Sequence, residues 1–103
     1  FEHLVAWYER MVSFGHGNAE MILGKEALDQ ASASEPEEMM DAAFLDNFQA
    51  GQSVSVMPID YGFQPVIGEL LVAGMDEVAV ARNNDQVGRI VVHFPRTGFR
   101  VVD

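Results

Sequence analysis

Apolar and polar side chains alternate along residues 51–103, which is the pattern of half-buried β-strands. The predicted strands are rich in Val, Ile and Phe, and Gly, Pro, Asn or Asp closes each of them. They are expected over residues 53–56, 66–73, 78–80, 89–94 and 99–102. Gly68 predicts a bulge or bend in the second strand, where a small barrel must curl. Because a sandwich needs more strands, the pattern predicts a small SH3-like barrel.

The first half of the chain has helical spacing instead. Four large apolar side chains stand at the i, i+3, i+4 and i+7 positions of a helix predicted over residues 1–13: Leu4, Trp7, Tyr8 and Met11. A second helix is predicted over residues 19–30. A third is expected to begin at the N-cap Ser34, with Pro36 in its first turn, and to end near Leu45.

The change of period predicts an α+β fold. Residues 1–50 form an acidic helical segment of two to three helices, and residues 51–103 form a small five-stranded antiparallel SH3-like β-barrel. With 103 residues, of which 49% are hydrophobic, the chain can bury a core of its own. It begins with Phe1, and whether it is a fragment of a longer protein or an independent module stays open.

The charge of the chain disfavours two classes of partner. The formal net charge is −10, and residues 1–52 carry ten acidic residues against Arg10 and Lys25. Phosphate backbones and anionic lipid repel so acidic a chain, so neither nucleic acid nor a membrane is an expected partner. No apolar run reaches eighteen residues, and the absence of Cys makes a cytoplasmic location the simplest expectation.

The sequence shows no catalytic constellation. The three histidines lie in different predicted elements, which is a poor basis for a zinc site, and no Ser stands in a nucleophile-elbow context. The acids around Glu35 are interpreted as helix caps and solubilising charge. No catalytic residue, metal site or cofactor is therefore predicted, and the chain is not expected to be an enzyme by itself.

Two sets of residues remain as candidate sites. Arginines and aromatic groups near the barrel mouth could bind a small anion or support a minor enzyme activity: Tyr61, Arg82, His93 and Arg96. The excess of Met and aromatic residues in the helical segment suggests an apolar surface that meets another protein or a second copy: Trp7, Met39, Met40, Phe44 and Phe48.

Two stretches of this sequence resemble a known family. Leu4, Trp7, Arg10 and Met11 have the spacing Leu-x-x-Trp-x-x-Arg-Met found near the end of the helical domain of some bacterial glutathione S-transferase-like proteins. The stretches 61–68 (Tyr-Gly-Phe-Gln-Pro-Val-Ile-Gly) and 91–99 (Val-Val-His-Phe-Pro-Arg-Thr-Gly-Phe) resemble the barrel-like extension that a subset of them carries.

The resemblance implies a carboxy-terminal part of such a protein. The family binds glutathione and supplies its catalytic side chain in a thioredoxin-like domain, and no βαβ unit of that kind is present in this chain. The leading hypothesis is thus a non-catalytic interaction or structural module that contacts a protein partner or forms a homodimer through its helical segment. The alternative is the small-molecule binder or minor enzyme described above.

Overall fold

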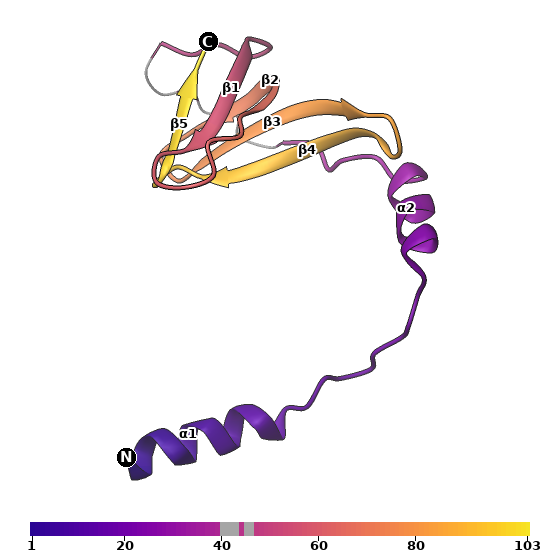
Figure 1. Cartoon of the computed structure of the whole chain (residues 1–103), viewed down its shortest axis with the longest axis vertical. Helices are drawn as coiled ribbons and strands as arrows, with labels where there is room; N and C mark the ends of the chain where they lie inside the picture. Colours follow the sequence, from indigo (N-terminus) through magenta and orange to yellow (C-terminus); the bar gives the residue numbers. More distant parts are fainter. Residues whose placement is uncertain (40–43, 45–46) are drawn as a thin grey trace.

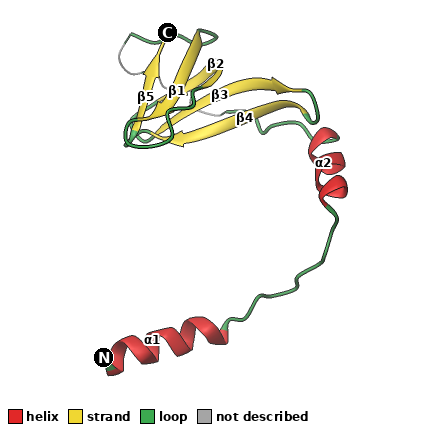
Figure 2. Ribbon diagram, in the orientation of Figure 1, coloured by secondary structure: helices red, strands yellow, loops and turns green. Residues whose placement is uncertain are grey.

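The computed structural model describes residues 1–39, 44 and 47–103. The described residues form two helices followed by five strands, so the predicted α+β class is confirmed (Figures 1 and 2). The elements are α1 (Glu2–Ser13), α2 (Gly24–Ser32), β1 (Ser53–Pro58), β2 (Val66–Ala73), β3 (Glu77–Asn84), β4 (Gly88–Pro95) and β5 (Phe99–Val102).

The five strands form one antiparallel sheet in the order β4-β3-β2-β1-β5. β5 returns to pair with β1, with Val56 opposite Val101, while β4 pairs along its whole length with β3. β4 and β5 lie at opposite ends of the strand order, and the described residues give no ladder between them. The predicted closure of the barrel is therefore not confirmed, and the sheet is open.

The core lies on the concave face of this curled sheet. Its buried members come from β1, β2 and β3: Val54, Val56, Leu70, Ala73, Val78 and Val80. In β2 the register shift between Leu70 and Val72 breaks the strict alternation, so Leu70 and Ala73 both belong to the core. Phe94 and Phe99, from the two end strands, cover the core with ring centroids 5.1 Å apart. The alternation read from Val54 and Val56 is thus confirmed, because both are buried.

The predicted bulge at Gly68 is wrong in its position. The register between β2 and β3 shifts between Leu70 and Val72, whereas Gly68 pairs regularly with Val54. A Cβ atom at Gly68 would lie 2.5 Å from the carbonyl oxygen of Ala81. Glycine is needed here because the backbone of the neighbouring strand approaches closely.

The helical segment differs from the prediction in two places. The second helix begins at Gly24, where the carboxylate of Glu26 accepts a hydrogen bond from the Leu23 N–H (3.1 Å) and satisfies one free donor at the helix start. The predicted third helix is wrong over residues 34–39, which have no regular structure, and at Phe44, which bridges in parallel to Ala73.

Proline explains part of this difference. Pro36 disfavours the α conformation at the residue before it, so the segment can leave the helical path where the N-cap was expected. The remainder of that predicted helix, residues 40–43 and 45, lies outside the described residues.

α1 stands apart from the sheet at the end of an irregular segment, residues 14–23 (Figure 1). The radius of gyration is 18.5 Å, whereas a compact chain of 100 residues has about 13 Å. None of the residues of α1 or α2 is buried. The molecule is therefore a small sheet module that carries a projecting helical arm.

Candidate interaction surface

The apolar stripe of α1 is uncovered. We call its four members, Leu4, Trp7, Tyr8 and Met11, the α1 face; their exposed fractions run from 42% for Met11 to 62% for Tyr8. Val5 and Val12 widen the stripe and are also exposed. A helix in a folded protein normally buries such a stripe against another element. The α1 face is therefore the strongest candidate for a contact surface in the described chain.

The backbone hydrogen bonds at the ends of α1 join residues of the helix to each other and to their direct neighbours in the chain. Gly15, at a φ of +63°, ends the helix in the left-handed conformation that was expected there, and the Gly15 N–H donates to the carbonyl of Val12 (3.0 Å). α1 has 12 residues, and isolated helices shorter than about 12–15 residues are marginal in water. Burial of the α1 face would supply the missing stability.

Charges border the α1 face asymmetrically. At 100° per residue, His3 and Arg10 flank Trp7, while Glu2 and Glu9 flank the opposite edge beside Val5 and Val12. A surface that receives the α1 face would therefore match it best with acidic groups on one side of an apolar groove and basic groups on the other.

The other residues predicted for the interaction surface lie elsewhere. Phe44 and Phe48 are half-buried and pack against the core of the sheet. Met39 is half-buried beside β4, and Met40 lies outside the described residues. Among these predicted residues, Trp7 is thus the one that the structure places on the α1 face.

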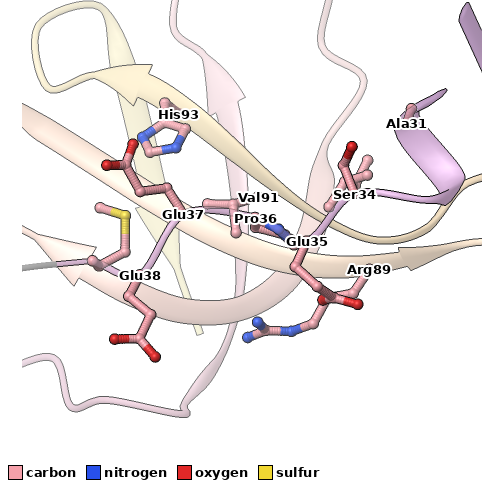
Figure 3. A pocket seen from close by; sticks show the side chains of 11 residues that line it. Ala31, Ser34, Glu35, Pro36, Glu37, Glu38, Arg89, Val91 and His93 are labelled. Atoms are coloured by element: carbon pink, nitrogen blue, oxygen red, sulfur yellow. The ribbon is translucent and has the colours of Figure 1, made fainter.

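A second feature is a cavity on the outer face of the sheet. It has a volume of about 540 Å³ and lies between residues 31–39 and β4 (Figure 3). Residues from both sides line it: Ala31, Ser34, Glu35, Pro36, Glu37, Glu38, Met39, Arg89, Ile90, Val91 and His93. On the same face of β3, Ala79 and Ala81 are buried although they point away from the core.

His93 lies on the sheet side of this cavity. Its Nδ1 contacts Oε1 of Glu77 on the neighbouring strand β3, and both side chains are about half exposed. In Figure 3 the carboxylate of Glu37, on segment 34–39, points toward the His93 ring, and Glu38 points away from it. The sequence indicated His93 but not Glu77; their proximity follows from the β3–β4 register, which places His93 opposite Ala79.

The structure does not bring the predicted ligand-binding residues to one face. Arg82 pairs with Ile90 and His93 pairs with Ala79, so the two side chains point to opposite sides of the β3–β4 hairpin. Tyr61 is 88% exposed in the β1–β2 connection, and Arg96 is half-buried in the turn between β4 and β5. Of the four, His93 lines the cavity of Figure 3.

No group of three or more His, Cys, Asp or Glu side chains in residues 1–39, 44 and 47–103 is placed to hold a metal ion. Within the same described part of the chain, neither helix has the length and apolar character needed to cross a membrane.

Comparison with known proteins finds solved structures that are similar to this chain. No protein-family model matches the chain, and no curated protein matches it. A solved structure of a GST-like protein from Pseudomonas syringae is similar to 96% of this chain, with 36% sequence identity and a TM-score of 0.83. The chain spans 37% of the length of that protein. The resemblance to part of a bacterial glutathione S-transferase-like protein, predicted from the motifs in α1, in residues 61–68 and in residues 91–99, is confirmed, and the match is consistent with the carboxy-terminal part.

Proposed function

We propose that this chain is a non-catalytic interaction and structural module of a glutathione S-transferase-like protein, and that it contacts its partner through the α1 face. The observation that carries the proposal is the uncovered apolar stripe of a helix too short to be stable alone. The match to 37% of a longer GST-like chain supports it, because the rest of such a chain offers a surface for α1.

The size of the α1 face favours a partner in the same polypeptide. Burial of one large apolar side chain contributes about 1.5–3 kcal/mol, whereas association of two free molecules costs about 4–15 kcal/mol. Four such side chains therefore support only weak association of two separate molecules, which is detectable at high partner concentration. When the partner is tethered, the effective concentration lowers that cost. The net charge of −10 also disfavours a second copy, since the two chains repel each other.

The proposal also covers the shape of the sheet and the location of the protein. We infer that the sheet is a partly open relative of an SH3-like barrel, supported by the return of β5 to β1 and by the contact between Phe94 and Phe99. We also propose a cytoplasmic location, which fits a sequence without Cys.

Trp7 provides the test, because it is the single tryptophan of the chain. Its fluorescence reports directly on the α1 face as the chain is titrated with the part of the Pseudomonas syringae GST-like protein that lies outside the matched region. We expect a saturable blue shift with one-to-one stoichiometry, and light scattering should show the chain alone as a monomer. A Trp7 emission that stays that of a solvated indole at saturating partner would refute the proposed contact. A blue shift that depends on the concentration of the chain alone would support self-association instead.

A further inference from the structure

We propose that the connections at one end of the sheet form a second docking surface, and that the remaining part of the GST-like polypeptide covers it. We call its four members, Ile59, Tyr61, Phe63 and Met75, the sheet-end patch; their exposed fractions run from 64% to 88%. This inference rests on the proposed function, because it takes the same partner that the α1 face contacts. It adds a contact on the sheet, in the stretch 61–68 whose likeness to the family the α1 face does not explain.

The β1–β2 connection, residues 59–65, exposes three of these side chains on a braced backbone. Pro58 precedes it and Pro65 ends it, and each proline fixes its own φ. Between them Gly62 has a φ of +77°, and the Gln64 N–H donates to the Gly62 carbonyl (2.7 Å). A connection that is already ordered loses less conformational entropy when a partner binds it. The exposed aromatic rings of this connection are therefore suited to a specific contact, because aromatic side chains supply a large contact area.

Two backbone hydrogen bonds bring the neighbouring turns to the same end of the sheet. The Ile59 N–H donates to the carbonyl of Gly98 in the β4–β5 turn (3.0 Å). In the same turn the Arg96 N–H donates to the carbonyl of Asp76 in the β2–β3 turn (2.9 Å). Met75, the residue before Asp76, therefore lies at the same end as Ile59. A soluble monomer seldom gathers large apolar side chains on its surface unless they contact a partner or a ligand.

The arrangement of α1 and the sheet identifies the partner that covers the patch. Figure 1 shows the chain as an arch: α1 and the sheet-end connections lie opposite each other, and residues 14–23 and α2 join them on the other side. Residues 1–23 are more than a fifth of the chain. A displaced α1 would therefore not allow a TM-score of 0.83 over 96% of this chain. The arch is thus also present in the solved structure of the longer GST-like protein.

Contacts within the described chain do not hold this arch in place. Among the described residues, no backbone hydrogen bond joins residues 1–23 to the sheet, and no residue of α1 or α2 is buried. Most of the GST-like protein lies outside the match, since this chain spans 37% of its length. That remaining part is the body that keeps α1 and the sheet apart, and it contacts both the α1 face and the sheet-end patch. The patch belongs to the connections, so the ladders of the sheet do not change when it is covered.

Alkylation of single thiols tests this inference on the full chain, which contains no Cys of its own. Gln64→Cys places a thiol beside Phe63 and leaves the sheet-end patch complete. Gln86→Cys is the matched control, because Gln86 is also exposed and lies in the tip of the β3–β4 hairpin, at the opposite end of that hairpin from the patch. Each variant is titrated with the part of the Pseudomonas syringae GST-like protein that lies outside the matched region, and Trp7 reports the α1 contact in the same sample.

A covered thiol reacts only in the free fraction of the chain. With the partner at about ten times its Kd, the Gln64→Cys thiol should therefore react about tenfold more slowly, while the control rate should change by less than about twofold. Circular dichroism checks that both variants are folded. If Gln64→Cys loses its fold, Phe63→Ala decides, and the Trp7 titration should then show an affinity lowered at least about tenfold.

The two proposals fail in different ways. A blue shift of Trp7 without protection of the Gln64→Cys thiol, or with equal protection of both thiols, overturns the sheet-end inference and leaves the α1 contact in place. An unchanged affinity in Phe63→Ala does the same. No blue shift at saturating partner refutes both proposals. Protection that rises with the concentration of the chain alone assigns the patch to a second copy, and it also overturns the inference.

Discussion

Replacing Gly68 by Ala is expected to lower the free energy of unfolding by about 1–3 kcal/mol. The added Cβ would lie 2.5 Å from the carbonyl oxygen of Ala81 and 3.2 Å from Cβ of Val80. Both neighbours belong to the adjacent strand β3, so relief of the clash requires the ladder between β2 and β3 to move. For a domain of this size, each kcal/mol lowers the melting temperature by about 4–8 °C.

Urea denaturation followed by circular dichroism measures this effect. Gly74→Ala is the matched control, since a Cβ there would meet its nearest atom at an ordinary 3.7 Å and Gly74 follows the same strand. The control should change the free energy of unfolding by much less than Gly68→Ala. Equal stability of Gly68→Ala and the parent chain would show that β2 and β3 do not approach as closely as described.

Replacing Leu4 and Met11 by Ala is expected to weaken binding to the partner segment of the GST-like protein strongly. Each change removes a large apolar side chain worth about 2 kcal/mol when buried, which is roughly a thirtyfold loss of affinity per residue. Alanine is the best helix former, so α1 itself should form at least as readily in the variants. The Trp7 titration measures the loss, because both substitutions leave Trp7 in place.

Glu9→Ala is the control for this pair. Glu9 borders the α1 face and carries a similar number of side-chain atoms, but an exposed charge pair contributes only about 0.2–1 kcal/mol, so its removal should lower the affinity by no more than about fivefold. If Glu9→Ala and Leu4→Ala weaken binding equally, the helix acts through its charge and the apolar stripe is not the contact surface.

The strands were predictable because their physical signal is local. A side chain in a strand alternates between two faces, so Val54, Val56, Val78 and Val80 could be assigned to a core without knowledge of the fold. The closure of a sheet is not local. Closure depends on whether the sheet curls far enough to bring β5 beside β4. The alternation of apolar and polar residues carries no information on this curvature.

The role of Gly68 and the path of residues 34–39 depended on tertiary contacts. A glycine within a strand indicates either a bulge or a close approach, and the register of β2 against Ala81 of β3 decides between them. Likewise, Ser34 and Pro36 are typical of a helix start, but in this protein residues 34–39 have no regular structure and line a cavity against β4. Neither the approach of Ala81 to Gly68 nor the path of residues 34–39 can be predicted from the local sequence.

The apolar stripe of α1 could be predicted from the sequence, but its exposure could not. The helical spacing of Leu4, Trp7, Tyr8 and Met11 identified the stripe, but only the structure showed that nothing in the described chain covers it. Phe44 and Phe48 contribute to the same excess of apolar residues, yet they pack against the core of the sheet. An excess of apolar residues indicates buried area without stating which element it covers.

Hydrogen exchange of the α1 amides, measured on the chain alone and with the partner segment of the GST-like protein, tests the central claim most directly. In the isolated chain, residues 6–13 should exchange nearly as fast as an unstructured peptide, while Val56 and Val80 in the sheet stay protected. Addition of the partner should slow exchange in α1 at least tenfold and leave the sheet unchanged. Strong protection of α1 in the monomeric chain, or none with the partner bound, would contradict the proposal that the partner covers the α1 face.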